Sequence, residues 1–543
     1  MLLLCIFVTL FTPLKALCQN NEKTFDSLLT AQFPADGPGG VALVAKEGKI
    51  IYEKAFGKVN LELNVPMKTD NVFRIGSNTK QFTAIAIFKL AEEGKLSIHD
   101  DITKFIKDYP TQGKTITIED LLTHTSGIKN YTGVSKWTKQ LRRTDLTPKE
   151  LVDFFKNEPM DFSPGEEYRY DNSGYILLGY IIELVSGKTY AQYINENFFQ
   201  LLGMKNSFYD DPSKIIRNRA SGYKKNGDHF ENSDFLSMTL PYAAGSLLST
   251  VDDFFIWYQA VTNLKVINKN DLEKAQTSYK LKSGKLTGYG YGWETGNVQG
   301  RASIKHVGVV NGFVTYAAYL PVEKIFIAIF SNCECAGDLD YPASKIAAIL
   351  LNKPYQYNKI ELPVQQLEAC QGVYHTAYNG DKIITCQDGQ LVYCSKGGRK
   401  SQLIPFKKDM FFIENSLISF KFQRNSKGNV IGFDLNNTGM PDNGIRTDAK
   451  IKSINQIHID MGLLEKYAGK YEFASAFIFY VDKEGDKLYG RVGDDKKEII
   501  PFDTNKFIAK DLDATIIFNL DANGNVTGLT KIQSSEMTAK RIN

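Results

Sequence analysis

The sequence predicts an α+β domain followed by two small all-β barrels, and three observations lead to this fold class. Strand-like segments stand near both ends of residues 19–354, and mostly helical segments lie between them. That order favours one sheet built from both ends of the segment. After Pro354 short strands and turns replace the helices, and the pattern then occurs a second time. A repeated β-rich unit is typical of two similar small barrels.

The elements of the first domain follow from hydrophobic periodicity. β-Forming residues alternate on either side of Glu47-Gly48, so residues 39–57 are expected to form a hairpin. From Ser77 the apolar pattern becomes helical, and Gly94 is expected to end that helix. Further along, the pattern predicts helices across residues 100–265, strands across 301–332 and a closing helix across 341–352.

Three pairs of similar segments define the repeat. The pairs are "LEACQGVY" from Leu367 with "LEKYAGKY" from Leu464, "LIPF" from Leu403 with "IIPF" from Ile499, and "GNVIGF" from Gly428 with "GNVTGL" from Gly524. Matches in one order at nearly one offset indicate a duplicated unit of about 90 residues with about eight strands in each copy. We therefore expect one lipocalin-like barrel in residues 355–455 and another in residues 456–543.

Charge and composition exclude some classes of protein. The 543 residues carry a net charge of only +4 and no basic run, which argues against nucleic acid as a partner. Residues 1–18 are apolar and end in a small-x-small pattern, so we expect a signal peptide cleaved before Gln19, although basic residues are missing at its start. A lipoprotein anchor at Cys18 fits less well, because Lys15 and Leu17 suit lipid attachment poorly. We expect an exported, periplasmic or secreted chain without a stable membrane span, since no later run of about 18 apolar residues occurs.

The cysteines predict no metal site. Five cysteines follow the signal peptide, and an odd number leaves at least one thiol free or bonded to another chain. Cys333-x-Cys335 lacks the second pair of ligands that a zinc site needs. A hairpin turn keeps Cys386 and Cys394 out of register, so a direct bond between them is not expected. We interpret these residues as structural or inert, with their pairing left open.

Ser77 and Lys80 are the first candidates for catalysis. Residues three apart on a helix share a face, so the lysine would lie beside the serine hydroxyl. A serine becomes a good nucleophile when a neighbour removes its proton, and burial can lower a lysine pKa far enough for that task. The alternative is a helix cap followed by a solvated lysine. The same spacing occurs again at Ser126 with Lys129 and at Ser221 with Lys224.

Two further short motifs carry side chains that suit a hydrolase. Tyr170-x-Asn172 stands directly before a helical run. A phenol whose pKa is lowered by a nearby ammonium can relay protons, and an amide can orient substrate or the lysine. His306-x-Gly308 lies on a predicted strand, where glycine allows close approach of another backbone and imidazole can bind or shuttle protons. Each motif alone also fits a purely structural role.

In the order S-x-x-K, Y-x-N and H-x-G, the motifs resemble those of the serine β-lactamase and penicillin-binding-protein family, in its class C-like branch. The resemblance covers residues 24–352 and implies an antiparallel sheet flanked by helices plus an all-helical subdomain. A catalytic domain with two barrels also resembles the D-aminopeptidase branch. Further segments that carry the resemblance are "LLTHTSGI" from Leu121, "PGEEYRYDNSGYILLG" from Pro164, "AAGSLLSTVDDF" from Ala243, "YGYGWE" from Tyr289 and "HVGVVNGF" from His306.

The resemblance implies a role for each motif residue. Ser77 would be the acylated nucleophile and Lys80 its proton acceptor. Tyr170 would share proton transfer to the leaving group and activate the deacylating water. Asn172 would orient Lys80 and bind the substrate amide. The oxyanion hole would consist of the N–H groups of Ser77 and Val309, and no metal or cofactor is implied.

Two positions depart from the family pattern. Asp171 stands where the family has serine or alanine, and its side chain is expected to face away from the site. His306 replaces a lysine that helps bind a substrate carboxylate in true β-lactamases, and a histidine that is mostly neutral at pH 7 offers less positive charge. Gly308 is expected to lie at the substrate. Family members with H-x-G resemble D-aminopeptidases and other exported peptidases and esterases.

We therefore expect an exported serine hydrolase that acts through a Ser77 acyl-enzyme on a peptide or amino-acid amide that contains a D-residue. A class C-type β-lactamase or a D-alanyl-D-alanine carboxypeptidase is the first alternative, with a β-lactam or acyl-peptide substrate. An esterase is the second. A non-catalytic binding protein is the least favoured, because Ser77, Lys80, Tyr170 and Asn172 are all present. The sequence does not determine the oligomeric state.

Overall fold

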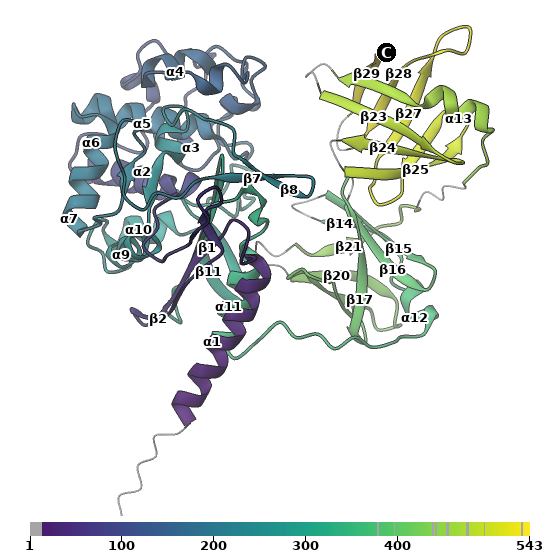
Figure 1. Ribbon diagram of the computed structural model, residues 1–543, viewed down its shortest axis with the longest axis horizontal. Coiled ribbons are helices and arrows are strands. Elements are labelled where there is room, and N and C mark those ends of the chain that lie inside the picture. Colours follow the sequence, from purple (N-terminus) through teal and green to yellow (C-terminus); the bar gives the residue numbers. More distant parts are fainter. Residues whose placement is uncertain are drawn as a thin grey trace, which may run out of the picture. The chain divides into compact units, whose positions relative to one another are not determined.

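The computed structural model describes residues 13–542 except for gaps at 377–379, 396, 437–438, 440–441, 452–455, 474–476, 493–494 and 534–535. The chain forms two compact units, of which the first reaches to Pro354 and the second begins at Tyr355 (Figure 1). Among the described residues we find no helix with the length and apolar character of a membrane span. The predicted signal peptide, residues 1–18, lies mostly outside the described part of the chain.

A six-stranded antiparallel sheet forms the centre of the first unit, in the order β10-β11-β12-β13-β1-β2. β1 pairs with β13, with Val44 opposite Ile327, so the sheet joins both ends of the segment as predicted. Every residue of β13 is buried, which requires cover on both faces of the sheet. The strands are β1 Gly40–Lys46, β2 Lys49–Phe56, β10 Glu294–Val298, β11 Arg301–Val310, β12 Phe313–Leu320 and β13 Ile325–Ser331.

Helices fill the chain between β2 and β10, and two more flank the sheet segments at either end (Figure 1). They are α1 Pro13–Gln32, α2 Thr79–Glu92, α3 Ile118–Leu122, α4 Pro148–Phe155, α5 Asn172–Ser186, α6 Tyr190–Ile194, α7 Gln200–Leu202, α8 Tyr242–Gly245, α9 Val251–Thr262, α10 Lys269–Ala275 and α11 Asp340–Leu350. Short strands connect them: β3 Lys58–Asn60, β4 Val65–Pro66, β5 Phe73–Arg74, β6 Phe208–Tyr209, β7 Tyr223–Asn226, β8 His229–Asn232 and β9 Leu247–Ser249.

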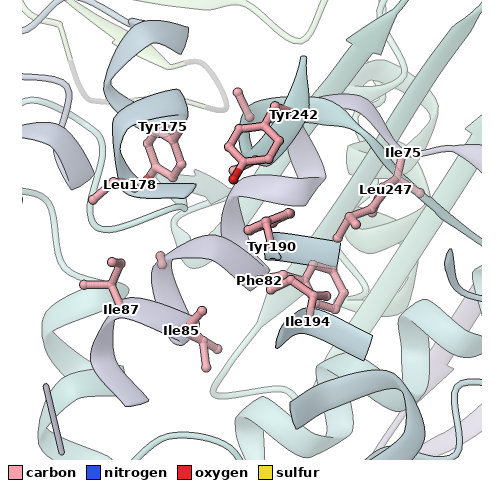
Figure 2. Close-up of a cluster of buried hydrophobic side chains, with 14 of the residues drawn as sticks. Ile75, Phe82, Ile85, Ile87, Tyr175, Leu178, Tyr190, Ile194, Tyr242 and Leu247 are labelled. Carbon is pink, nitrogen blue, oxygen red and sulfur yellow. The ribbon is translucent and has the colours of Figure 1, made fainter. Parts of the chain in front are cut away.

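The helix α2 is almost completely buried, and its packing fixes the position of Lys80. Eleven of its 14 residues are buried. Phe82 stacks on Trp257 of α9, with ring centroids 3.9 Å apart. Figure 2 shows Phe82 in one cluster with Tyr175 of α5 and Tyr190 of α6. Because each buried apolar side chain of this size stabilises by roughly 1.5–3 kcal/mol, the helix is held firmly among its neighbours.

Each copy of the repeat forms a closed, eight-stranded antiparallel barrel, as predicted. An equivalent hydrogen bond occurs within each copy. Tyr374 OH donates to the Cys370 carbonyl in the first, and Tyr471 OH donates to the Tyr467 carbonyl in the second, both at 2.7 Å. The first comprises α12 Val364–Glu368, β14 Gly372–Thr376, β15 Gly380–Gln387, β16 Gln390–Ser395, β17 Lys400–Lys407, β18 Met410–Phe412, β19 Ser419–Arg424, β20 Val430–Asn436 and β21 Gly444–Arg446. The second comprises α13 Met461–Tyr467, β22 Gly469–Phe473, β23 Phe477–Glu484, β24 Lys487–Val492, β25 Asp495–Asp503, β26 Lys506–Ala509, β27 Thr515–Leu520, β28 Val526–Ile532 and β29 Glu536–Ile542.

The five cysteines from Cys333 onward, which lie in the described part of the chain, form one disulfide and three free thiols. Cys333 and Cys335 are bonded to each other, a pairing that their spacing had not indicated. Cys370, Cys386 and Cys394 are free thiols. Cys386 lies opposite a leucine across its hairpin, which is the predicted register and keeps it apart from Cys394. Within the described residues, no group of histidine, cysteine and acidic side chains is arranged to hold a metal ion.

Candidate active site

Ser77 lies in a short 3-10 turn, Gly76–Asn78, between β5 and α2. The helix begins at Thr79, two residues later than predicted, so Ser77 does not cap it. The chain turns sharply at Gly76, whose φ is +52°. A Cβ atom at Gly76 would lie only 2.8 Å from the backbone nitrogen of Val309, so glycine is required at this close approach. The turn thereby brings Ser77 against the backbone of β11.

The side chain of Lys80 is buried beside Ser77. Its Nζ donates hydrogen bonds to Ser77 Oγ at 3.1 Å, to Asn172 Oδ1 at 2.9 Å and to the Ala244 carbonyl at 3.0 Å. Burial lowers the pKa of Lys80 from 10.5 to about 7, although the carboxylate of Asp171 acts in the opposite direction. Lys80 is therefore substantially neutral near pH 7.

The three contacts of Lys80 suit both of its protonation states. An ammonium group has three N–H donors for the three acceptors. A neutral amine has two donors and one lone pair, which match two acceptors and one donor. Asn172 Oδ1 and the Ala244 carbonyl can only accept, so the lone pair faces the Ser77 hydroxyl. A proton can therefore pass from Ser77 Oγ to Lys80 Nζ without rearrangement of the site.

Tyr170 lies over Lys80 and next to Ser77. The centroid of its ring is 4.8 Å from Lys80 Nζ. Burial raises the pKa of Tyr170 well above its ordinary value, and a hydrogen bond with Ser77 offsets only part of this effect. The prediction of a phenol pKa lowered by the ammonium is therefore wrong, because loss of water outweighs the favourable contacts. Tyr170 is a neutral hydrogen-bond donor near pH 7.

The side chain of Asp171 points to the first turn of α5 and, within the described structure, forms no hydrogen bond with Ser77 or Lys80. Its carboxylate is buried and caps α5, accepting hydrogen bonds from Ser173 N at 2.8 Å and Gly174 N at 2.9 Å. Burial raises the pKa of Asp171 from 3.8 to about 7, while these N–H donors and Lys80 act against the rise. Asp171 thus fixes where α5 begins, which positions Asn172, and it adds a negative charge that acts on Lys80.

Sequence reasoning missed His124, which lies in the "LLTHTSGI" segment. Its side chain is buried, and its ring centroid is 4.3 Å from that of Tyr170. Its Nδ1 accepts a hydrogen bond from Asp171 N at 3.1 Å. The segment itself was noticed, but no local spacing relates His124 to residues 46 or more positions later. Only the packing of α3 against α5 brings them together.

His306 is buried, and both of its ring nitrogens have hydrogen-bond partners within the protein. Its Nδ1 lies 2.7 Å from the Val307 carbonyl, which can only accept, so Nδ1 carries the proton. Its Nε2 then accepts from the hydroxyl of Tyr289 at 2.9 Å. Burial and the charge of Lys80 lower the pKa of His306 to about 3. His306 is therefore neutral near pH 7 and supplies no positive charge to a substrate.

Gly308 and Val309 bring β11 to the turn that carries Ser77. A Cβ atom at Gly308 would lie 2.0 Å from the Ile75 carbonyl, so this position allows the close backbone approach that was predicted. The side chain of Val309 is 61% exposed and its backbone nitrogen faces Gly76. The backbones of Ser77 and Val309 thus belong to two segments in direct contact, as an oxyanion hole requires.

A cavity of about 200 Å³ lies beside Ser77. Among the described residues that line this cavity, Arg142 is the one with a charged side chain. The Nε of Arg142 is buried and has no hydrogen-bond partner in the described structure. Aromatic and aliphatic side chains form much of the remaining wall. The lining residues are Ser77, Tyr131, Thr132, Trp137, Arg142, Asn172, Leu236, Pro241, Ala244, Gly245, Val309, Val310 and Asn311.

The other two serine–lysine pairs of the same spacing are engaged elsewhere. Lys129 forms an ion pair with Asp161 at 2.9 Å, and Lys224 forms one with Asp234 at 2.9 Å. Both lysine side chains are partly exposed, unlike Lys80. Burial at the start of α2, and not spacing alone, distinguishes the pair at Ser77.

Comparison with known proteins identifies the family of this chain. Residues 27–350 match the family model described as "Beta-lactamase". The chain belongs to the β-lactamase family. Penicillin-binding protein 4* of Bacillus subtilis (strain 168) is 27% identical over 460 residues, which is 79% of this chain and 99% of that protein. Protein flp of Staphylococcus aureus (strain N315) is 28% identical over 304 residues, which is 54% of this chain and 59% of that protein.

Several solved structures share the fold of this chain. An octameric penicillin-binding protein homologue from Pyrococcus abyssi matches with a TM-score of 0.56 and 28% identity, over 78% of this chain and 99% of that one. A D-amino acid amidase from Ochrobactrum anthropi SV3 matches with a TM-score of 0.54 and 20% identity, over 61% and 99% of the two chains. Residues 457–542, the second barrel, match a domain of unknown function, DUF3471. The protein is thus a hydrolase of the β-lactamase and penicillin-binding-protein type with added barrels.

Proposed function

We propose that this protein is an exported serine hydrolase that cleaves peptide or amino-acid amide bonds at a D-residue through an acyl-enzyme on Ser77. The observation that carries the proposal is the buried Lys80, whose Nζ lies 3.1 Å from Ser77 Oγ and whose pKa is lowered to about 7. A lysine in this state can act as a base at neutral pH. A solvated lysine next to a helix cap would show neither property.

In acylation, Ser77 Oγ attacks the carbonyl carbon of the scissile amide and its proton moves to Lys80 Nζ. The N–H groups of Ser77 and Val309 stabilise the oxyanion. The bond between the carbonyl carbon and the amide nitrogen then breaks. The leaving amine takes the hydroxyl proton of Tyr170, which Lys80 replaces, so Tyr170 works as a neutral relay in keeping with its raised pKa.

In deacylation, a water oxygen bonds to the acyl carbon and the bond from that carbon to Ser77 Oγ breaks. The proton of the water passes through the pair of Tyr170 and Lys80 and returns to Ser77 Oγ, so the free enzyme is restored. Asn172 holds Lys80 by the 2.9 Å contact throughout both steps. No step needs a charge from His306, which is neutral and engaged with Tyr289.

A fluorophosphonate probe tests the nucleophile, because it forms a stable adduct with an activated serine. We expect wild type to be labelled and Ser77→Ala to remain unlabelled. Ser221→Ala is the matched control, since Ser221 has the same spacing to a lysine but bonds to Asn60. Equal labelling of wild type and Ser77→Ala would refute the assignment. Lys80→Ala should slow labelling by about a hundredfold or more.

A substrate panel tests the bond type: D- and L-amino-acid anilides, acyl-D-alanyl peptides, p-nitrophenyl esters and nitrocefin. The proposal expects D-anilides or D-peptides to be cleaved with the highest kcat/KM. Nitrocefin hydrolysis at a comparable rate would instead favour a β-lactamase, and cleavage of esters without amides would favour an esterase. A chain that is neither labelled nor active would be a binding protein.

Export is part of the proposal and rests on the apolar start of the chain. Mass spectrometry of the protein from the producing cell tests it directly. A mature chain that begins at Gln19 outside the cytoplasm is the expected result. A chain that retains residues 1–18 in the cytoplasm would contradict it.

A further inference from the structure

His124 holds the segment that carries Tyr170 from both sides. Its backbone carbonyl accepts a hydrogen bond from Arg169 N at 3.0 Å. Its side-chain Nδ1 accepts one from Asp171 N at 3.1 Å. These donors are the residues directly before and after Tyr170, so one histidine fixes the backbone on either side of the tyrosine.

The ring of His124 also supports the ring of Tyr170. The two ring centroids are 4.3 Å apart, with the planes inclined by 38°. Tyr289 packs against His124 and bonds to His306. Its ring centroid is 4.6 Å from that of His124, and its hydroxyl forms a hydrogen bond with His306 Nε2. His124 is 1% exposed, so the tyrosine ring rests on a fixed surface and not on solvent.

The backbone conformation of His124 is unusual and is held by the residues around it. Its φ is +58°, in the left-handed region that non-glycine residues rarely adopt. The conformation points both the carbonyl and the imidazole at the segment 169–171. A residue that only filled space would not need this backbone geometry.

The imidazole must be neutral to make these contacts. Nδ1 accepts from a backbone N–H, so the proton of the ring is on Nε2. A protonated ring would place a second N–H against that of Asp171. Burial, together with the charge of Lys80, keeps the pKa of His124 well below its ordinary value.

We infer that His124 is a positioning residue for Tyr170, needed for proton transfer to the leaving amine and from the deacylating water. The inference rests on the proposed function and assigns a residue to the same reaction. Within the described structure, His124 forms no hydrogen bond with Ser77 or Lys80. Its loss should therefore affect the steps that need Tyr170 more than the nucleophilicity of Ser77.

Two variants separate the hydrogen bond from the ring. His124→Asn places an amide oxygen near the position of Nδ1 and keeps an acceptor for Asp171 N. His124→Phe keeps an aromatic ring but leaves that N–H buried without a partner. His99→Phe, at an exposed histidine of the same unit, is the matched control for the substitution.

Two rates are measured for each variant: kcat/KM for a D-amino-acid anilide and the labelling rate with a fluorophosphonate. Fluoride leaves without a proton, so labelling needs Ser77 and Lys80 but no proton donor for the leaving group. We expect His124→Phe to lower anilide hydrolysis about 10- to 100-fold and labelling by no more than a few-fold. His124→Asn should retain most anilide activity.

A double mutant gives the decisive comparison. If His124 acts through Tyr170, His124→Phe should add little to the loss caused by Tyr170→Phe. Additive losses, or labelling and hydrolysis that fall in parallel, would overturn the inference. So would wild-type hydrolysis in His124→Phe. A wild-type enzyme that is labelled but cleaves no amide would instead refute the proposed amide substrate, and one not labelled at Ser77 would refute the nucleophile.

Discussion

Replacing Lys80 by methionine should change how the stability of the first unit depends on pH. Methionine has a similar unbranched shape and suits a buried position. The substitution removes a charge from a site where burial favours the uncharged form. It also leaves Asn172 Oδ1 and the Ala244 carbonyl without their donor, which costs about 1–3 kcal/mol for each acceptor and acts against the gain.

The lowered pKa sets the size of the effect. The pKa of Lys80 falls from 10.5 in the unfolded chain to about 7 in the folded one, and each unit corresponds to about 1.4 kcal/mol. Folding with a charged Lys80 therefore costs about 5 kcal/mol below pH 7. The folded state binds fewer protons than the unfolded state above pH 7, so wild-type stability recovers as pH rises towards 10.5. Between pH 6 and pH 9 this contribution changes by about 3 kcal/mol.

Tryptophan fluorescence during urea unfolding measures this change in the full-length chain. All three tryptophans, Trp137, Trp257 and Trp293, lie in the first unit, so the signal does not report the barrels. We expect the stability of Lys80→Met relative to wild type to be about 3 kcal/mol greater at pH 6 than at pH 9.

Asp171 acts against part of this difference. Its carboxylate attracts Lys80 only while the lysine is charged, so the attraction favours wild type near pH 7 and is absent from both chains at pH 9. Lys89→Met, at a partly exposed position of α2, is the control for loss of one lysine from the helix. Parallel stability profiles of wild type and Lys80→Met from pH 6 to pH 9 would refute a lysine with a lowered pKa.

Three further substitutions test neighbouring parts of the site. Asp171→Ser should move the acid limb of the kcat/KM profile to lower pH, because it removes the carboxylate that raises the pKa of Lys80; an unchanged midpoint would contradict this. His306→Gln should retain activity because its amide oxygen can accept the tyrosine hydrogen bond, whereas His306→Leu should lose about tenfold in kcat/KM; equal losses would show that the ring itself is needed. Gly308→Ala should abolish fluorophosphonate labelling, since its Cβ would lie 2.0 Å from the Ile75 carbonyl; labelling at the wild-type rate would disprove the clash.

Much of the fold could be predicted because its signals are local. The hairpin around Glu47-Gly48 and the strands of residues 301–332 each show alternation within a few residues. The internal repeat predicted two barrels without any knowledge of their contacts. The bond between Cys333 and Cys335 was not indicated, because two residues of separation fit several conformations equally well.

The site could be predicted only as far as its motifs reach. Ser77, Lys80 and Asn172 meet through hydrogen bonds, as their motifs suggested. The direction of the Tyr170 pKa could not be obtained from spacing, because it depends on how completely water is excluded. The capping role of Asp171 could not be predicted for a related reason: it follows from the exact start of α5, and helix boundaries are what a sequence predicts least reliably.

Opposing effects of similar size set the state of Lys80, and this explains why its role needed a structure. Three hydrogen bonds, the face of Tyr170 and the carboxylate of Asp171 all favour the charged form. Burial alone opposes them, yet it prevails and brings the pKa to about 7. The packing of α2 around Phe82 is therefore part of the chemistry, since any change that admits water would return Lys80 to the charged form. The base depends on the core as much as on its motif.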